Sequence, residues 1–321
     1  MDDTEHLMPR YLRFVRGVID SSDLPLNVSR EILQSNKVID GIRAGSVKKV
    51  LGMMESMAKN EPEKYQSFWT EFGKVVKEGP VEDFSNREQI MKLLRFASTS
   101  GEGSAQTVSL GDYVSRMKEG QDKIYYITAD NYTAAKNSPH LEIFEKKGIE
   151  VLLMSDRVDE WLMGQVFDFD GKSFQSVSKG ELDLGGIDGE SAEEKPEEKE
   201  ESKALLERIK TALSERVEDV KVSQRLTRSP SCIVLNEHEM AMYMQQLLKQ
   251  AGQEIPTSKP VLEVNVDHPI VARLQSEADG DRFNDWSALL LDQAILAEGG
   301  HLEDPAGFVA KMNDIMLALA K

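Results

Sequence analysis

The sequence has a single cysteine, no long apolar run and comparatively few basic residues. Cys232 stands alone, so the chain can form no internal disulfide, which fits a reducing compartment. No stretch approaches the roughly 18 apolar residues that a membrane-spanning helix needs. The first residues, MDDTEHLMPR, lack the basic start and apolar core of a signal peptide. We therefore expect a cytoplasmic chain without a membrane partner.

Basic residues are scarce relative to acidic ones: 39 Lys and Arg stand against 56 Asp and Glu, for a formal charge of -17. This charge would repel a phosphate backbone, so no nucleic-acid partner is expected. The five histidines are scattered, and HEMAM at 238–242 lacks the second histidine of a zinc helix. Phosphate-loop and dinucleotide-binding motifs are also missing. We expect no metal or cofactor in this chain, and find no complete catalytic constellation.

A chain of 321 residues predicts more than one domain. Apolar residues at helical spacing predict helices from Val47 onward, with a second stripe over 65–76 that Gly79 and Pro80 stop. Ser85 and Glu88 resemble a capping box ahead of a third helix. Its expected apolar face consists of Ile90, Leu93, Leu94 and Ala97. These segments predict a helical unit.

After the polar loop at 98–106 the apolar pattern changes. Ser109 and Asp112 are placed to cap a short helix, and KIYYITA and IEVLLM are rich in strand formers. Between these strands, Ser138 can begin a helix and Gly148 can end it. Strand, helix and strand predict a parallel pair in a small α/β/α subdomain. The acidic residues of 188–201 predict a linker.

The C-terminal part predicts a mixed α+β domain. An amphipathic helix carrying Leu205, Leu206, Ile209 and Leu213 precedes strands in VEDVKVSQRL, CIVL and VLEVNV. Two strongly apolar helices end the chain, and Asp304 is expected to cap the second. Their apolar residues wrap wider than the stripe of a helix that covers one core. Dimerisation through a four-helix bundle and ordinary core packing both explain this pattern.

Two further apolar features have a structural and a functional interpretation. Asn236 and Glu239 are expected to open a helix whose apolar residues include Met240, Met242, Met244, Leu247 and Leu248. Methionine is flexible, so such a helix can adapt to many apolar partners, but it can equally pack in a core. Trp161, flanked by acidic residues, is also explained either by the core or by a half-exposed binding site.

Several segments resemble the middle and C-terminal regions of the ninety-kilodalton heat-shock chaperones, most closely the bacterial HtpG type. The resemblance is carried by DSSDLPLNVSREILQSNK, YQSFWTEFGKVVKEGPVEDFSNREQIMKLLRFAST, SLGDYVSRMKEGQDKIYYITADN, EVLLMSDRVDEWLM and LTRSPSCIV. It covers nearly the whole chain in order. It implies a chaperone fold of several domains, α/β and α+β, that ends in a dimerisation domain with a helical pair.

The resemblance implies five parts and a missing one. The parts are a remnant of the large middle subdomain with the arginine loop (1–46), a helical unit (47–104), the small α/β/α middle subdomain (105–185), an acidic linker (186–203) and the C-terminal dimerisation domain (204–321). In the family an N-terminal domain binds ATP and Mg, and that domain is expected to be absent here. A natural truncation and an excised piece of a longer chain both fit.

Arg30 stands near an expected helix start, where a cation opposes the helix dipole and is ordinarily a solvated charge. The resemblance implies that Arg30 contacts the γ-phosphate of ATP in the other domain, with Gln34 in support. An arginine suits this role because its planar fork stabilises charge on a transferring phosphoryl group. The family hydrolyses ATP, but this chain alone is expected to be inactive.

The resemblance also assigns the apolar features. Residues expected to contact unfolded or partly folded clients are Trp161, Met240, Met242, Met244, Leu247 and Leu248. Residues expected in the dimer interface are Leu289, Leu290, Ile295, Phe308, Met312, Ile315, Met316 and Leu319. Co-chaperones of the seventy-kilodalton heat-shock system are further expected partners. Two alternatives stay open: a module that supplies Arg30 in trans to a separate nucleotide domain, and an inert dimerisation scaffold.

Overall fold

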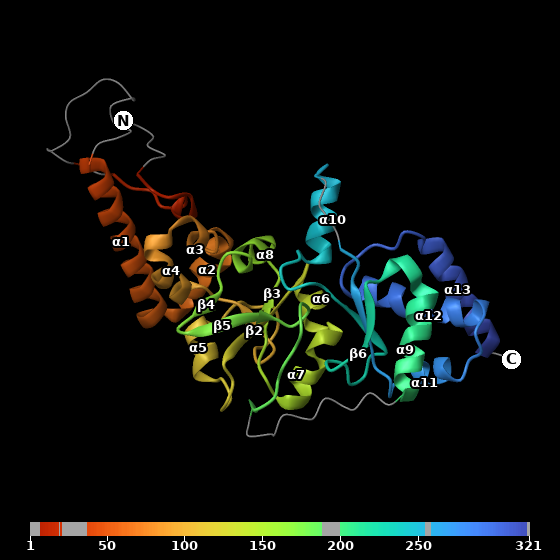
Figure 1. Cartoon of the computed structure of the whole chain (residues 1–321). Helices are drawn as coiled ribbons and strands as arrows, with labels where there is room; N and C mark the ends of the chain where they lie inside the picture. Colours follow the sequence, from red (N-terminus) through yellow and green to blue (C-terminus); the bar gives the residue numbers. More distant parts are fainter. Residues whose placement is uncertain (1–6, 19, 21–36, 188–199, 254–257, 320–321) are drawn as a thin grey trace. The chain divides into compact units, whose positions relative to one another are not determined.

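The computed structural model describes residues 7–18, 20, 37–187, 200–253 and 258–319 (Figure 1). They form two compact units. Unit 1 comprises the described residues within 1–97, 101–115 and 161–171, and unit 2 those within 98–100, 116–160 and 172–321. Helices and strands alternate along much of the chain, which confirms the predicted mixed α/β and α+β class.

Unit 1 is mainly helical, as predicted. Its elements are η1 (Arg10–Leu12), α1 (Lys37–Asn60), α2 (Pro62–Val76), α3 (Gly79–Glu82), η3 (Phe84–Asn86), α4 (Arg87–Leu93), α5 (Leu110–Ser115) and β4 (Asp168–Phe169). The apolar stripe of α2 faces inward, and Tyr65 and Trp69 are buried. Each also forms a hydrogen bond: Tyr65 Oη donates to the Leu93 carbonyl at 2.6 Å, and Trp69 Nε1 donates to Gln106 Oε1 at 2.9 Å.

Four details of unit 1 differ from the predicted helices. The first helix begins at Lys37 and not at Val47. Gly79 and Pro80 do not only stop α2, because they also start α3. The first turn of a helix tolerates proline, since a main-chain N–H there has no partner within the helix. The predicted capping box of Ser85 is wrong, because Asp83 Oδ1 accepts the N–H of Asn86 at 3.2 Å and a 3-10 turn precedes α4. Leu94 and Ala97 lie beyond the end of α4, although both are buried.

The first layer of unit 2 contains three parallel strands in the order β3–β2–β5. These are β2 (Lys123–Thr128), β3 (Leu152–Met154) and β5 (Lys172–Ser176). Between β2 and β3 lie α6 (Tyr132–Lys136), η4 (Pro139–Leu141) and α7 (Glu142–Lys147), and Gly148 ends α7 with a φ of 60°. The predicted strand, helix and parallel strand are confirmed. Two elements, β1 (Ala97–Ser98) and α8 (Arg157–Met163), cross the division between the units.

The second layer of unit 2 is a three-stranded sheet with helices on one face. Its order is β6–β8–β7, with β6 (Asp219–Val222) parallel and β7 (Ser231–Val234) antiparallel to β8 (Val261–Val264). The helices on this face are α9 (Glu200–Leu213), α11 (Pro269–Gln275) and α12 (Asp281–Ala297), and η6 (Ser214–Arg216) follows α9. Helix α13 (Pro305–Leu319) packs against α12. Alternate strand residues, including Ile233 and Leu262, join α9, α11 and α12 in one core.

Buried charged groups join the two layers of unit 2. Arg225 is fully buried; its Nη1 donates to the Val177 carbonyl at 2.5 Å and its Nε to Glu263 at 3.2 Å. From the other layer, the Glu142 carboxylate at the start of α7 accepts main-chain N–H groups of 227–229. These bonds hold the layer of the parallel sheet against the layer of the C-terminal sheet. The site described below is lined by residues of both layers.

The five-part domain division stays a prediction. Residues 188–199, most of the predicted acidic linker, lie outside the described residues, and helix α9 begins directly after them at Glu200.

Candidate functional site

Helix α10 (Met242–Gln250) carries four of the six residues expected to contact clients, but it begins later than predicted. Asn236 and Glu239 do not open the helix. Both bind Ser258 instead: Asn236 Nδ2 donates to Ser258 Oγ at 3.0 Å, and Ser258 Oγ donates to Glu239 Oε2 at 2.6 Å. Because these tertiary partners occupy the polar side chains, the segment before α10 forms a turn, and Met240 lies outside the helix.

The start of α10 is held by one buried carboxylate, that of Glu160 in α8. Glu160 Oε1 accepts the N–H of Ala241, the residue that caps α10, at 2.7 Å and the ammonium of Lys179 at 2.6 Å. Its Oε2 accepts the hydroxyl of Thr128 at 2.6 Å. Lys179 balances the buried charge, and three donors satisfy the carboxylate. Glu160 therefore connects α10 to the end of strand β2.

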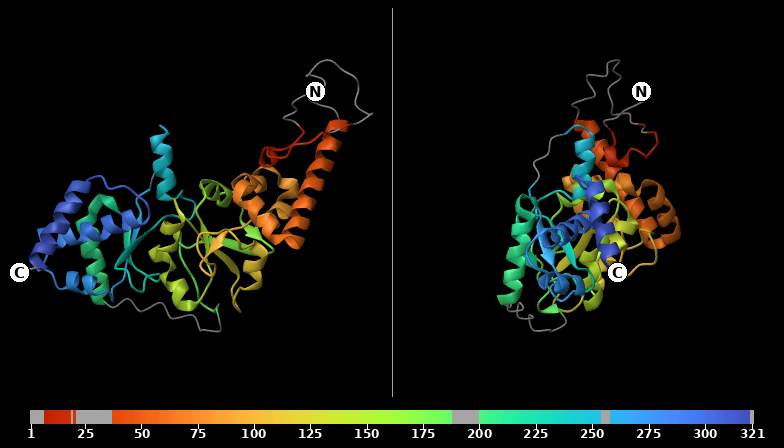
Figure 2. Two further views of the ribbon diagram at one scale, coloured as in Figure 1. Left: turned by 180° about the vertical axis from the view of Figure 1, so that it is seen from behind. Right: turned by 90° about the vertical axis from the view of Figure 1, so that its right-hand side faces the viewer.

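Burial decreases along α10. Tyr243 and Gln245 in its first turn are buried, whereas Lys249 and Gln250 at its end are exposed. The intervening apolar side chains are half-buried: Met242, Met244, Leu247 and Leu248, together with Met240 before the helix. Met242 packs against the core of the C-terminal sheet. The helix projects from the rest of unit 2 in Figures 1 and 2, so its later turns offer apolar surface that this core does not use.

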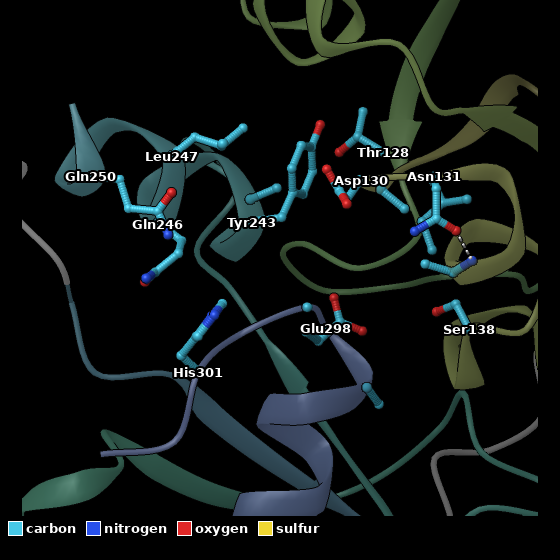
Figure 3. Close-up of a pocket in the computed structure, with 16 residues that line it drawn as sticks. Thr128, Asp130, Asn131, Ser138, Tyr243, Gln246, Leu247, Gln250, Glu298 and His301 are labelled. Carbon is cyan, nitrogen blue, oxygen red and sulfur yellow. Dashed lines mark hydrogen bonds between the residues drawn. The ribbon is translucent and has the colours of Figure 1, made fainter. Parts of the chain in front are cut away.

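A cavity of about 230 Å³ lies beside α10, within unit 2. It is bounded by the end of strand β2 and the following loop, by α10, and by the end of α12 with the residues after it (Figure 3). Its polar lining includes Asp130, Asn131, Tyr243, Glu298 and His301. No motif of the sequence indicates this cavity. The available signal is that Asp130 and Asn131 follow the end of a parallel strand, where ligands commonly bind in α/β sheets.

Tyr243, which lines the cavity, is only 6% exposed, as is Thr128 beside it. The Tyr243 hydroxyl faces Thr128, and no described group donates a hydrogen bond to the hydroxyl oxygen. Burial raises the pKa of Tyr243, and the carboxylates of Glu160 and Asp159 raise it further, so the phenol is neutral at physiological pH. A neutral phenol in this place can accept a hydrogen bond from a ligand and present an aromatic face to it.

The two C-terminal helices differ in how they use their apolar residues. Leu289 and Leu290 of α12 are buried, Leu290 within the core of the C-terminal sheet, and Ile295 is half-buried against that core. On α13, Phe308 and Ile315 are half-buried, and Met312 is 40% exposed. Met316 is 62% and Leu317 63% exposed. The Leu319 side chain lies outside the described residues. Asp304 caps α13, as predicted, by accepting the N–H of Gly307 at 2.9 Å.

The remaining predicted site residues lie elsewhere. Trp161 in α8 belongs to unit 1, and 49% of its surface is exposed. Arg30 and Gln34 lie outside the described residues. Within the described ranges, no cluster of three His, Cys, Asp or Glu side chains could hold a metal ion. No helix of those ranges is long and apolar enough to cross a membrane.

Comparison with known proteins decides the family. The model of the family described as Hsp90 protein matches residues 1–320. The chain belongs to the Hsp90 family. The chaperone protein HtpG of Nitrosococcus oceani is 62% identical over 321 residues, which are 100% of this chain and 51% of that protein. HtpG of Chromobacterium violaceum is 60% identical over 321 residues, again 100% of this chain and 51% of that protein.

A third Hsp90 relative, HtpG of Coxiella burnetii, is 56% identical over 317 residues, which cover 99% of this chain and 50% of that protein. The resemblance read from the sequence motifs is thereby confirmed. The chain spans about half the length of these Hsp90 relatives.

Proposed function

We propose that this chain binds unfolded or partly folded proteins and acts as a homodimer, as part of a chaperone. The observation that carries the proposal is apolar surface on α10 and α13 that the chain's own core leaves uncovered, in a chain of the Hsp90 family. Large uncovered apolar patches mark interaction sites, because a compact monomer would otherwise bury them. Two helices supply such surface, and we assign one to clients and the other to the second copy.

Helix α10 suits clients of varied sequence. Met244, Leu247 and Leu248 are half-buried, so a client would cover side chains already anchored at one end. Methionine and leucine present no directional polar group, and methionine adapts its shape to irregular partners. Trp161 in unit 1 offers a rigid, half-exposed aromatic of the kind enriched in binding hot spots. We propose both as client contacts, together with Met240 and Met242.

Helix α13 suits a second copy. Val309, Met312, Met316 and Leu317 leave apolar surface exposed on a helix at the end of the described chain. An isologous pair of such helices would bury these residues against their own copies. Phe308, Ile315 and Leu319 complete the proposed interface on this helix. Leu289, Leu290 and Ile295 support it from the core beneath.

We further propose that ATP binding and hydrolysis need residues outside this chain, in keeping with its length relative to the HtpG proteins. In that arrangement Arg30 and Gln34 would contact the γ-phosphate, and Mg would be held with ATP outside this chain. Co-chaperones of the seventy-kilodalton heat-shock system are the proposed protein partners besides clients.

The client proposal is tested by suppression of aggregation of a chemically denatured enzyme. We expect the wild-type chain to slow light scattering at near-stoichiometric amounts. The double variant Met240→Asp, Met244→Asp should lose most of this effect, because two carboxylates would have to be desolvated against an apolar client. A milder variant, Met240→Ser, Met244→Ser, should show a partial loss without a large change in thermal stability.

A matched control carries the same charge change in unit 1: Val18→Asp, Met53→Asp, at two exposed apolar positions. It should suppress aggregation as the wild type does. If the α10 variants suppress aggregation as well as the control does, α10 is not the client-binding surface. If the wild type has no effect, the chain is better described as an inert scaffold.

A further inference from the structure

The cavity beside α10 carries negative charge from two elements that are distant in sequence. Asp130 follows β2, and Glu298 ends α12 (Figure 3). Neither lysine nor arginine is among the lining residues that the structure describes. No described lysine or arginine forms an ion pair with Asp130. Glu298 Oε1 lies 2.8 Å from Nε2 of the buried His140. The carboxylate of Asp130 therefore has no lysine or arginine partner and is available to a cation that enters the cavity.

A second observation, independent of the carboxylates, also indicates a ligand. The hydroxyl of Tyr243 is buried and faces Thr128, but no described group donates a hydrogen bond to its oxygen, although buried polar atoms normally have their hydrogen bonds satisfied. Thr128 beside it already donates its own hydrogen to Glu160. The Tyr243 oxygen can therefore accept a hydrogen bond from a donor that enters the cavity.

The other walls fit an aliphatic stem. Ile127, Ala129, Ala241 and Leu247 line the cavity, and the Tyr243 ring adds an aromatic face that attracts cations. At about 230 Å³ the cavity is smaller than the roughly 300–1,000 Å³ of pockets for drug-sized ligands, so it fits a single side chain. The net charge of -17 raises the local concentration of cations around the chain.

We propose that this cavity receives an ammonium or guanidinium group on an aliphatic stem, as carried by a lysine or arginine side chain of a bound polypeptide. Asp130 and Glu298 balance the charge, Tyr243 accepts a hydrogen bond, and the apolar walls cover the stem. The inference rests on the proposed function, because Leu247 belongs both to the apolar surface of α10 and to the cavity. It gives client binding a preference: basic residues next to apolar ones.

The test uses two fluorescein-labelled nine-residue peptides that share an apolar sequence and differ only in a central lysine or glutamine. Binding to the full chain is measured by fluorescence anisotropy at pH 8 and low salt. The wild type should bind the lysine peptide about five-fold more tightly, within the range expected of a partly buried ion pair with an aromatic contact. The double variant Asp130→Asn, Glu298→Gln should bind both peptides equally, at the wild-type affinity for the glutamine peptide.

A matched control neutralises two exposed carboxylates of unit 2 away from the cavity, in Glu218→Gln, Asp267→Asn, and should keep the five-fold preference. Equal binding of both peptides by the wild type would overturn the inference. So would a preference that persists in the cavity variant or disappears in the control, since the latter would mean that overall charge is responsible.

A free amine tests whether the cavity binds the ammonium group itself, with or without an attached polypeptide. With n-butylammonium chloride at matched ionic strength, the lysine preference of the wild type should disappear, because the amine occupies the same cavity. If neither peptide binds the wild type, the proposed client function fails. The midpoint of thermal unfolding, measured with n-butylammonium chloride and with sodium chloride, then tests whether the cavity binds an amine. A rise with n-butylammonium over sodium chloride, in the wild type and not in the cavity variant, supports a small amine as the ligand. If the midpoint of the wild type does not rise with n-butylammonium, the inference is overturned.

Discussion

Glu142 shows how a single carboxylate can join two layers of the fold. At the start of α7 it accepts the N–H groups of Thr227 and Arg228, each at 2.6 Å, and the hydroxyl of Ser229, also at 2.6 Å. Burial alone would raise the pKa of Glu142, but the hydrogen bonds from Ser229, Arg228 and Thr227 outweigh it and hold the pKa below its ordinary value. The ionised form therefore stabilises the folded state.

Replacing Glu142 by glutamine should lower the free energy of unfolding at pH 7 by about 1.5–3 kcal/mol, the range for hydrogen bonds to a charged group. Because the folded pKa is the lower one, this contribution is complete above the unfolded pKa of about 4.3 and is lost as the pH falls through the folded value. The difference in urea midpoint between wild type and Glu142→Gln should be constant from about pH 8 to pH 5 and narrow below that.

The exposed carboxylate of Glu218 in the same unit serves as the control, and Glu218→Gln should change little at any pH. A difference for Glu142→Gln that stays the same down to pH 3, or that is absent at pH 7, would contradict the assigned role.

At the scale of elements, two glycines in unit 2 have the same backbone requirement and different surroundings. Gly120 before β2 has a φ of 80° and Gly148 after α7 a φ of 60°. A Cβ on Gly120 would collide with the carbonyl oxygen of Gly186, whereas one on Gly148 would meet only the flexible Lys118 ammonium at 3.6 Å. The turn before β2 therefore has no room for a side chain.

We expect Gly148→Ala to destabilise the chain by about 1 kcal/mol, from the left-handed backbone alone. Gly120→Ala should cost clearly more, because the main chain at 186 must also move. Thermal midpoints by circular dichroism give the comparison. Equal midpoints for the two variants would contradict this expectation, because they would mean that the main chain at Gly186 moves aside without loss of stability.

The elements that the sequence predicts well are those set by local chemistry. Ser109 and Asp112 form the expected reciprocal cap of α5: the N–H of Asp112 donates to Ser109 Oγ at 3.0 Å and that of Ser109 to Asp112 Oδ2 at 3.2 Å. Ser138, Gly148 and Asp304 also act as predicted, because caps and stops depend on neighbours within a few residues.

The features that the sequence does not predict depend on distant partners. Helix α10 begins after Ala241 because Glu160, far away in the chain, accepts its N–H, and no local pattern contains that information. The cavity needs Asp130 and Glu298 together, which only the packing of the two layers of unit 2 provides. Apolar periodicity marks α12 and α13 equally, yet Leu290 is buried and Leu317 exposed, because burial depends on which helix covers the sheet.

At the scale of the whole molecule, the proposed dimer rests on α13. Sedimentation equilibrium of the wild type should give twice the 36.0 kDa of one chain. The variant Met316→Asp, Leu317→Asp should sediment as a single chain, because two carboxylates per copy would be buried in an apolar interface. The control Val18→Asp, Met53→Asp should remain a dimer. A wild type that sediments as one chain at micromolar concentration would contradict the assignment of α13.

The central claim is that α10 binds polypeptides that are not folded. Hydrogen–deuterium exchange of the wild-type chain, with and without a permanently unfolded protein such as reduced and carboxymethylated α-lactalbumin, tests it most directly. We predict that the unfolded protein slows exchange of the amides of 242–250 at the exposed end of the helix. Unchanged exchange in 242–250 under saturating client, with protection confined to other segments, would contradict the account.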